Sequence, residues 1–306
     1  MRPNEPLCRH ARFGIGGPCL ALVDAAEQDA FLEALTLARE SGLPFAILGG
    51  GTNLIVAGEG FPGLVLRYRD TRITASNGGV QCGAGADLQT LVDFTIDKGL
   101  AGLHTMTGIP GWVGGALYGN AGAYGHSIME SVARVRYLDG ERVRTIDNAG
   151  CEFRYRESAF KRNKHWIVLS AELEMPRGEP ITLRAQASQI QTIRDEKYPP
   201  AMRCAGSIFK NCIFTELPAA VAAQLPETMV REGKVPSAWF LEQVGAKGMR
   251  RGDIQVAHYH ANLIYNDGEG RSADVCAIID ELKRRVQDRF GLTLEEEVQY
   301  VGFPDR

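Results

Sequence analysis

Two glycine-rich segments constrain the fold of this chain more than any other feature of its sequence. The first, residues 48–54, reads LGGGTNL and directly follows a short apolar run. The second, residues 107–125, reads TGIPGWVGGALYGNAGAYG and places seven glycines within eighteen residues. Because glycine has no side chain, such segments let backbone amides approach a ligand closely. An anionic pyrophosphate is the ligand that we expect at amides of this kind.

Both segments are also compatible with structures that bind no ligand. Clustered glycines most often mark turns, and a glycine-rich helix can pack closely in a core. The first segment does not match the doubly wound dinucleotide fold, because Leu54 stands where the third glycine of that fingerprint belongs. The two segments alone therefore predict close backbone contact rather than a particular ligand.

Charge and hydropathy exclude several classes of protein. The 306 residues carry a net charge of −3 without a long block of like charge, so no electrostatic footprint for nucleic acid is visible. No apolar run approaches the roughly 18 residues of a membrane span, and the amino terminus shows no signal peptide. We expect a cytoplasmic protein with no nucleic-acid partner and no membrane insertion.

The cysteines and histidines do not form the pattern of a metal site. The seven scattered cysteines include no C-x-x-C pair, so we expect free thiols in a reducing compartment. His258 and His260 lack a third ligand at suitable spacing, and we expect structural roles for both. The sequence therefore predicts no metal.

Hydrophobic periodicity predicts an α+β protein with a break near residue 200. Pro199-Pro200 ends a helical segment and is the best candidate for a domain boundary. Asp139-Gly140 predicts the two-residue turn of a hairpin over residues 132–146. Helices are expected at 24–41, 87–98, 183–197, 237–244 and 272–290. Strands are expected at 45–48, 64–68, 80–82, 166–175, 207–209, 254–257, 262–265 and 293–303.

The pair LGGGTNLIV and TGIPGWVGGALYGNAGAYG closely resembles the two FAD-contacting segments of the UDP-N-acetylenolpyruvoylglucosamine reductase family. The resemblance implies the α+β FAD-binding fold of the vanillyl-alcohol-oxidase (PCMH) type, with subdomains over residues 1–70 and 71–198. It also implies a smaller C-terminal α+β substrate-binding domain over residues 199–306. The residues implied to bind FAD, without a covalent bond, are Gly49, Gly50, Gly51, Thr52, Asn53, Leu54, Gly108, Ile109, Gly111, Gly114, Gly115, Asn120 and Gly122.

Three further stretches resemble motifs of the same family, in the same order along the chain. Residues 155–161, YRESAFK, are similar to its Y-R-x-S-x-F-K motif and imply a catalytic arginine at Arg156. Residues 206–211, GSIFKN, are similar to its G-S-x-F-K-N motif and imply a serine proton donor at Ser207. Residues 294–298, LEEEV, are similar to its terminal L-x-x-E-V motif and imply a catalytic glutamate at Glu297. The residues implied to contact the substrate are Tyr124, Lys210 and Asn211.

The reaction that the resemblance implies explains why these residue types are needed. NADPH reduces FAD, and hydride then reaches C3 of the enolpyruvyl ether of UDP-N-acetylglucosamine, which yields UDP-N-acetylmuramate for peptidoglycan synthesis. Hydride addition places negative charge on C2 and the adjoining carboxylate, which Arg156 and Lys210 can stabilise. A protonated Glu297 can hydrogen-bond to the enol, and Ser207 can donate the proton that C2 requires.

The chain departs from the family pattern at two places. Cys212 stands where a proline commonly follows the serine motif, which leaves the conformation of that loop open. About fifty residues separate Arg156 from Ser207, an interval in which we expect no substrate-covering tyrosine loop like that of the longer branch. The resemblance therefore implies the shorter branch of the family.

Two alternatives remain open from the sequence. Another FAD-dependent oxidoreductase of the same fold, such as an alcohol or hydroxy-acid oxidase, usually carries a larger substrate cap than the roughly one hundred residues after Pro200. A non-catalytic nucleotide-binding regulator would be indicated by the loss of Arg156, Ser207 or Glu297. All three residues are present.

Overall fold

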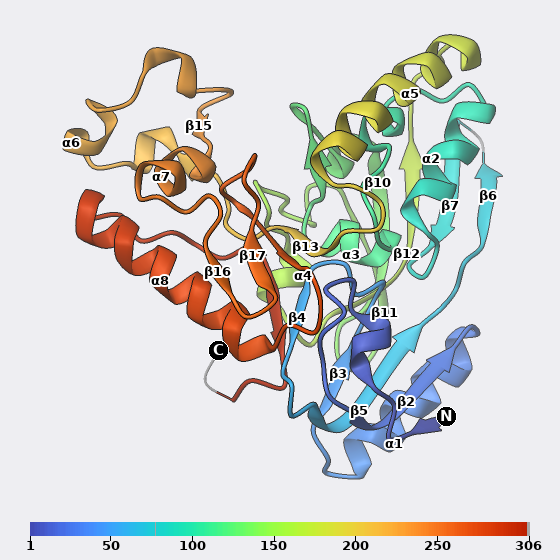
Figure 1. Ribbon diagram of the computed structural model, residues 1–306. Helices are drawn as coiled ribbons and strands as arrows, with labels where there is room; N and C mark the ends of the chain where they lie inside the picture. Colours follow the sequence, from blue (N-terminus) through green and yellow to red (C-terminus); the bar gives the residue numbers. More distant parts are fainter. Residues whose placement is uncertain (77, 305–306) are drawn as a thin grey trace. The chain divides into compact units, whose positions relative to one another are not determined.

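The chain divides into two compact units in the computed structural model, which describes residues 1–76 and 78–304 (Figure 1). Unit 1 comprises Met1–Glu5, Cys19–Gly51 and Gly63–Pro199, and unit 2 comprises Pro6–Pro18, Thr52–Pro62 and Pro200–Arg306. The long part of unit 2 thus begins inside the diproline. The two short segments, 6–18 and 52–62, belong to unit 2 although the sequence predicts them within the first FAD-binding subdomain.

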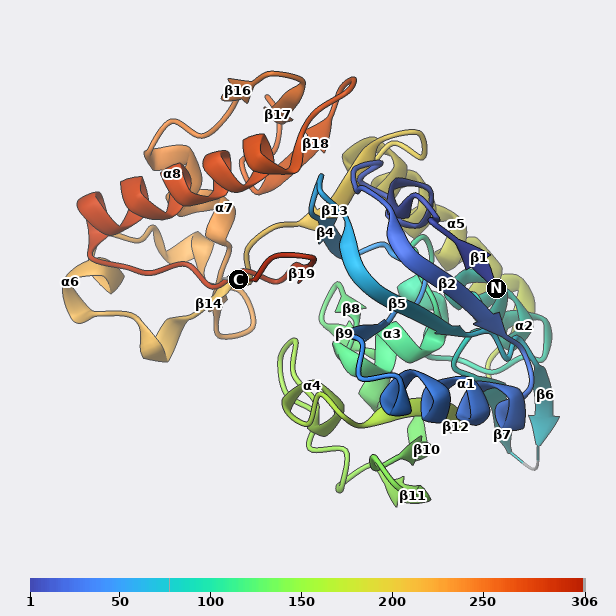
Figure 2. The same cartoon turned by 90° about the horizontal axis from the view of Figure 1, so that it is seen from below.

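The first sheet of unit 1 has the strand order β1 (Arg2–Pro3), β2 (Cys19–Ala25), β5 (Phe61–Tyr68), β3 (Phe45–Ile47). β3 runs parallel to β5, and β1 runs antiparallel to β2. Helix α1 (Gln28–Glu40) lies along β2 and buries Phe31, Leu35 and Ala38 (Figure 2). The helix begins later than the predicted residue 24, because residues 24 and 25 are still paired within the sheet as the end of β2.

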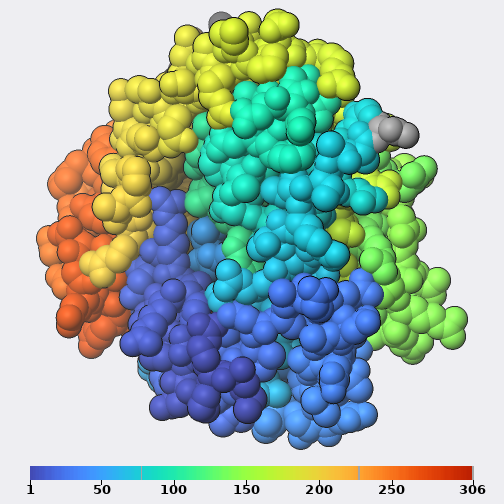
Figure 3. Space-filling model, turned by 90° about the vertical axis from the view of Figure 1, so that its right-hand side faces the viewer, coloured from blue at the N-terminus to red at the C-terminus, as the bar shows by residue number. Residues whose placement is uncertain are grey.

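The second sheet of unit 1 is antiparallel, with the order β11 (Val143–Asp147), β10 (Val132–Leu138), β12 (Ile167–Glu174), β7 (Gly79–Gly83), β6 (Ile73–Ser76). Helix α3 (Val113–Tyr118) packs on β7 and β12. Helix α2 (Leu88–Asp97) packs against α5 (Pro180–Lys197), and in Figure 3 the teal and yellow parts of the chain that contain them lie beside each other on the surface. The other elements are η2 (Leu103–Met106), β8 (Gly122–Ala123), β9 (His126–Ser127), η3 (Ile128–Glu130) and α4 (Ala159–Arg162).

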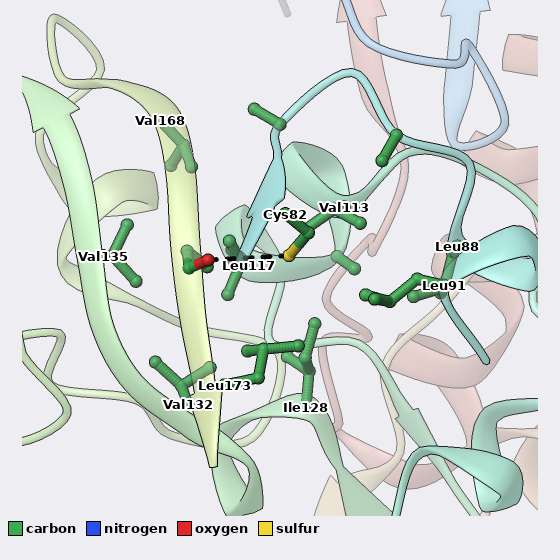
Figure 4. Close-up of a cluster of buried hydrophobic side chains, with 14 of the residues drawn as sticks. Cys82, Leu88, Leu91, Val113, Leu117, Ile128, Val132, Val135, Val168 and Leu173 are labelled. Atoms are coloured by element: carbon green, nitrogen blue, oxygen red, sulfur yellow. Dashed lines mark hydrogen bonds between the residues drawn. The ribbon is translucent and has the colours of Figure 1, made fainter. Parts of the chain in front are cut away.

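The core of unit 1 fills the space between this sheet and its helices. Figure 4 shows Val113 and Leu117 of α3 beside Cys82 of β7, whose thiol lies 3.8 Å from the carbonyl oxygen of Ala171. Leu88 and Leu91 of α2 belong to the same buried cluster. The second glycine-rich segment therefore contributes a helix that is anchored in the core on one side.

The predicted hairpin forms, but its turn lies one residue later than the sequence predicts. Asp139 donates its N–H to the carbonyl of Arg142 at 3.0 Å, so the two central residues are Gly140 and Glu141. One Asp139 carboxylate oxygen accepts the N–H groups of Glu141 and Arg142 at 3.0 and 2.8 Å. Asp139 is thus the residue before the turn, and Gly140, with φ of 108°, takes its first central position.

Unit 2 contains a four-stranded antiparallel sheet in the order β13 (Arg203–Ser207), β18 (Leu263–Asn266), β17 (Ile254–Val256), β16 (Arg250–Arg251). Helix α8 (Ser272–Phe290) contacts β16 and buries the apolar stripe that the sequence predicts. The other elements are η1 (Leu7–His10), β4 (Leu54–Val56), β14 (Cys212–Ile213), η4 (Phe214–Glu216), α6 (Ala219–Ala222), η5 (Glu227–Met229), β15 (Lys234–Val235), α7 (Ser237–Gln243) and β19 (Gln299–Val301).

The carboxy-terminal strand is shorter than the predicted 293–303. Only Gln299–Val301 forms a ladder, parallel to β4. Residues 295–297 instead pair with the segment after β13, through a single bridge between Phe209 and Glu296. The parallel ladder between β19 and β4 explains why residues 52–62 belong to unit 2.

Among the helices of the described residues, none has both the length and the apolar character that a membrane crossing requires. All seven cysteines are free thiols. Burial raises the pKa of the Cys82 thiol, and that of Cys151, to about 12. Both side chains are therefore held as neutral thiols by their apolar surroundings.

These pKa shifts predict low thiol reactivity in the native protein. At pH 8 a thiol with a pKa near 12 is ionised in on the order of one molecule in ten thousand. Iodoacetamide should therefore leave Cys82 and Cys151 unmodified in native protein and should alkylate both in guanidinium, as read by peptide mass mapping. Rapid labelling of either residue in the native state would contradict the buried positions.

Candidate active site

The two glycine-rich segments lie directly against each other. A Cβ atom on Gly50 would lie 3.1 Å from the Cα atom of Gly111 and 3.1 Å from the Trp112 side chain. A Cβ atom on Gly49 would lie 4.0 Å from the same indole, which is ordinary contact distance. Gly51 and Gly111 have φ values of 68° and 121°, in the region that residues with side chains rarely adopt. Larger residues here would separate the two segments that the sequence predicts to bind one ligand.

Two arginines lie beside the ring of Trp112, the residue that directly precedes α3. The guanidinium carbons of Arg67 and Arg69 lie 5.5 and 5.6 Å from the ring centroid, within cation–π range. Arg67 also donates to both carboxylate oxygens of Asp24, at 2.6 and 2.9 Å. Burial opposes the ionisation of Asp24, but the Arg67 hydrogen bond and charge outweigh it and lower the pKa of that carboxyl. The start of α3 is thus fixed by paired, ionised side chains.

Two neighbouring glycines of α3 have different surroundings. A Cβ on Gly114 would lie 3.0 Å from the Ala84 Cβ and 3.1 Å from the Ala84 carbonyl oxygen, so this glycine is required for packing. A Cβ on Gly115 would meet no atom within 4 Å. An open helical glycine fits the close approach of a bound cofactor. The structure therefore gives Gly114 a packing role and leaves space at Gly115, where the FAD contact remains a prediction.

Gly108 and Ile109 are held by the protein itself. The Gly108 N–H donates to the Gln89 side-chain oxygen at 2.7 Å, and a Cβ on Gly108 would lie 3.0 Å from Gln191 of α5. Ile109 donates its N–H to the Met106 carbonyl at 3.0 Å and packs against the core. Gln89 is a residue that no motif in the sequence indicated, because its role depends on a loop nineteen residues away.

Asn120 and Gly122, which the sequence predicts as cofactor contacts, both bind the loop that carries Arg156. Asn120 is 3% exposed and donates from its side-chain nitrogen to the Arg154 carbonyl at 2.8 Å. The Gly122 carbonyl accepts a hydrogen bond from Arg156 Nη2 at 3.0 Å. These bonds tie the second glycine-rich segment to the predicted catalytic arginine.

Arg156 occupies a tight turn with a left-handed backbone, φ 56°. Arg154 and Glu157 close the turn with two backbone hydrogen bonds of 3.0 and 3.1 Å. The Lys161 ammonium donates to the Arg156 carbonyl at 2.9 Å and to the Glu157 carboxylate at 3.1 Å. A non-glycine residue in this conformation needs such support from its surroundings.

The remaining residues of the YRESAFK motif anchor this turn. Ser158 is fully buried, and its hydroxyl donates to the Tyr118 carbonyl at 2.7 Å while it accepts the Lys161 N–H at 3.1 Å. Phe160 is fully buried and packs edge-on against Tyr137. Sequence reasoning singled out only Arg156, whereas the serine, phenylalanine and lysine of the motif hold it in place.

Tyr124 lies at the tip of the β8–β9 hairpin. Tyr124 and Gly125 form its two-residue turn with φ values of 54° and 82°, and the tyrosine is 51% exposed. Its proposed contact with the substrate remains a prediction.

In unit 2, the structure brings Ser207 and Glu297 onto neighbouring segments. Ser207 is the last residue of β13. The Glu297 N–H donates to the Ile208 carbonyl at 2.7 Å, and the Lys210 N–H donates to the Glu295 carbonyl at 2.9 Å. The serine motif and the glutamate motif therefore form one extended pair, while Arg156 belongs to unit 1.

Asn53 fixes the backbone on the other side of Glu297. Its side-chain nitrogen donates to the Glu297 carbonyl at 3.0 Å, and its carbonyl accepts the Gln299 N–H at 2.9 Å. Thr52, Asn53 and Leu54 lie in unit 2, whereas Gly49, Gly50 and Gly51 lie in unit 1, so the first glycine-rich segment crosses the division between the units.

Lys210 and Asn211 are both engaged with protein groups. Lys210 is 7% exposed, and its ammonium pairs with the carboxylate of Glu295. The Asn211 side-chain oxygen accepts the Ser237 N–H at 3.4 Å. Cys212, which stands in place of the usual proline, pairs with Val235 in the β14–β15 ladder, and burial raises its pKa to about 11.

Comparison with known proteins identifies the family. The model of the UDP-N-acetylenolpyruvoylglucosamine reductase C-terminal domain matches residues 198–301, and an FAD binding domain matches residues 19–145. The UDP-N-acetylenolpyruvoylglucosamine reductase of Solibacter usitatus is 59% identical over 299 residues, which cover 98% of this chain and 96% of that protein. The chain belongs to the UDP-N-acetylenolpyruvoylglucosamine reductase family.

More distant members of this reductase family agree with the assignment. The reductase of Syntrophus aciditrophicus is 34% identical over 306 residues, which cover 98% of this chain and 91% of that protein. The crystal structure of the reductase from Thermus caldophilus covers 97% of both chains with a TM-score of 0.75 and 26% identity. The α+β fold and the FAD cofactor expected from the sequence are thereby confirmed, and the reductase domain distinguishes this chain from the alcohol and hydroxy-acid oxidases.

The two glycines of α3 provide a matched test of the FAD contact. Gly115→Val should give folded protein that binds little FAD, because the new side chain enters open space on the proposed cofactor side. Gly114→Val should lower the thermal midpoint instead, because the side chain would collide with Ala84. FAD content by absorbance and thermal midpoint by calorimetry separate the two. Stoichiometric FAD in Gly115→Val would show that the contact is wrongly assigned.

Proposed function

We propose that this chain reduces UDP-N-acetylglucosamine enolpyruvate to UDP-N-acetylmuramate, as an FAD-dependent oxidoreductase of peptidoglycan precursor synthesis that uses NADPH. The observation that carries the proposal is the 2.7 Å hydrogen bond from the Glu297 N–H to the Ile208 carbonyl. It holds the glutamate motif beside the serine motif, as a reaction that needs both residues requires. The names of relatives that are 59% and 34% identical describe the same activity.

The glycine-rich segments would hold the cofactor, and the open side of Gly115 is the best support for a contact there. At Gly108 and Gly114 the absence of a side chain is already explained by packing, so their contacts with FAD would be made by the backbone around them. When bound, FAD supplies the hydride that it receives from NADPH.

Arg156 and Lys210 would stabilise the negative charge that the reaction places on the substrate. Arg156 is half-buried, and Lys210 is 7% exposed, so each charge acts where water screens it little. Lys210 pairs with Glu295, whose side chain is 69% exposed. An anionic group of the substrate would replace Glu295 at the ammonium, and the displaced carboxylate would remain solvated.

Ser207 would donate the proton to C2 of the substrate, and Glu297 would hydrogen-bond to the enol. A serine hydroxyl is a weak acid, so this role needs a cationic environment. Lys210 lies three residues after Ser207 in the same extended segment, and the pairing with residues 295–297 orders that segment.

The same proposal assigns a function to each part of the chain. Residues 1–70 and 71–198 would form the two FAD-binding subdomains, and residues 199–306 would form the substrate-binding domain. The matches of the FAD binding domain to 19–145 and of the reductase C-terminal domain to 198–301 support this order. We further propose that the protein works in the cytoplasm on a small UDP-sugar without a nucleic-acid partner, which its net charge of −3 favours.

The two half-reactions provide the test of this function. Ser207→Ala should let NADPH bleach the flavin absorbance at a near-normal rate, since that step needs no proton on C2. The return of absorbance with enolpyruvyl substrate should slow by on the order of 10²–10⁴-fold. Stopped-flow absorbance follows both steps in one preparation.

Ser188→Ala, on the exposed face of α5, is the control and should leave both rates unchanged. Equal slowing of both steps in Ser207→Ala would indicate general damage to the site. A wild-type protein whose flavin absorbance returns faster with oxygen than with the enolpyruvyl substrate would support an oxidase instead. Protein without flavin or turnover would support a regulator.

A further inference from the structure

Asn262, which immediately precedes β18, binds both peptide groups of Phe209 with its side chain. Its side-chain oxygen accepts the Phe209 N–H at 2.9 Å, and its side-chain nitrogen donates to the Phe209 carbonyl at 2.8 Å. The same nitrogen donates to the Ser237 hydroxyl at 2.8 Å. Asn262 is 3% exposed, and Phe209 is 1% exposed. The carboxamide is therefore completely enclosed and hydrogen-bonded on both of its polar atoms.

The Asn262 side chain takes the place of a strand neighbour at Phe209, where the pairing between β13 and β18 has already ended. β13 pairs with β18 as far as Ser207 opposite Leu263, and the Ile208 N–H still reaches the Asn262 carbonyl at 3.1 Å. Before Asn262 the chain turns away, because His260 accepts the N–H groups of both Asn262 and Leu263. The next peptide groups, those of Phe209, then lack a strand neighbour on this edge. The Asn262 side chain supplies the donor and the acceptor that a neighbouring peptide would supply.

The opposite edge of the same segment is held by backbone bonds to residues 295–297. Ser207 itself follows Gly206, which adopts a left-handed φ of 72° in open surroundings. The register of β13 with β18 also shifts between Cys204 and Ser207. The path of residues 207–210 is therefore set by the bonds from its two edges, together with the burial of Ile208 and Phe209 in the core of unit 2.

We propose that Asn262 is a positioning residue, which acts through the backbone of Phe209 to set where the Ser207 hydroxyl stands. The inference rests on the proposed function, because it matters only if Ser207 donates the proton to C2. Asn262 makes no proton transfer of its own. Loss of its carboxamide lets the Ser207 segment shift, and shifts on the order of 1 Å in a catalytic group reduce rates by about 100-fold.

A double-mutant cycle separates this role from a merely structural one. Asn262→Ala should slow the return of flavin absorbance with the enolpyruvyl substrate by about 10- to 100-fold, with near-normal bleaching by NADPH and near-normal FAD content. In the Ser207→Ala background the same change should slow that step less than about threefold, because the group that it positions is already absent. Equal slowing in both backgrounds would overturn the proposal.

Asn266→Ala is the matched control, since Asn266 is also a buried asparagine of this sheet, 4% exposed, and its side chain binds Phe13 and the loop at 268–270. It should lower the thermal midpoint without changing either flavin step. If Asn262→Ala does not fold, Ser237→Ala provides the second test, because it removes one acceptor of the Asn262 nitrogen. A slowing of about threefold that disappears in the Ser207→Ala background supports the proposal, and no slowing overturns it.

The failure of this inference can be distinguished from failure of the proposed function. If Ser207→Ala itself leaves the second step unchanged, the function assigned to Ser207 is wrong. If Ser207→Ala slows that step and the Asn262 and Ser237 variants do not, only the positioning role is wrong.

Discussion

The close approach of Gly50 to Gly111 and Trp112 is the contact on which the rest of unit 1 depends. A single Cβ on Gly50 would stand 3.1 Å from both neighbours, which real Cβ atoms tolerate only if the neighbour moves. The Gly111 contact is with main chain, and Trp112 lies beside two arginines that both pair with Asp24, so neither neighbour moves easily. The absence of a side chain at one position thus allows two segments sixty residues apart in the sequence to lie together.

From this contact a series of hydrogen bonds leads to the predicted catalytic arginine. α3 starts directly after Trp112, packs on the sheet through Gly114 and ends at Tyr118, whose carbonyl accepts a hydrogen bond from the Ser158 hydroxyl. Ser158 caps the short helix from which Lys161 supports the Arg156 turn. Ser158 is fully buried, so the loss of either of its two hydrogen bonds would leave a donor or an acceptor unpaired in the interior. The second glycine-rich segment and the Arg156 turn are therefore connected through contacts within unit 1.

In unit 2, a side chain rather than a strand provides hydrogen-bond partners for buried peptide groups. The segment after Ser207 is buried, so its peptide groups need partners on both edges. Residues 295–297 serve one edge and the Asn262 carboxamide serves the other. Asn53, predicted as a cofactor contact, binds the Glu297 carbonyl and so extends the same network into the first glycine-rich segment. The first glycine-rich segment, the serine motif and the glutamate motif are thus joined by hydrogen bonds although they are far apart in the sequence.

The sequence by itself determined the family, the FAD cofactor and the α+β class, and the comparisons confirm all three. It could do so because motifs such as GSIFKN and the glycine clusters are short continuous stretches of sequence. They can therefore be recognised without knowledge of the residues that contact them in the fold. Helix stripes such as Val275 to Phe290 were equally local and were predicted correctly. Only the tertiary structure decided the relations between distant segments. Residues 52–62 join the C-terminal unit, and Gly114 packs against Ala84 while Gly115 stays open. Gln89, Lys161 and Asn262 support loops elsewhere in the chain. A polar side chain carries no sign in the sequence of which distant peptide group it will satisfy, because that partner exists only once the chain has folded.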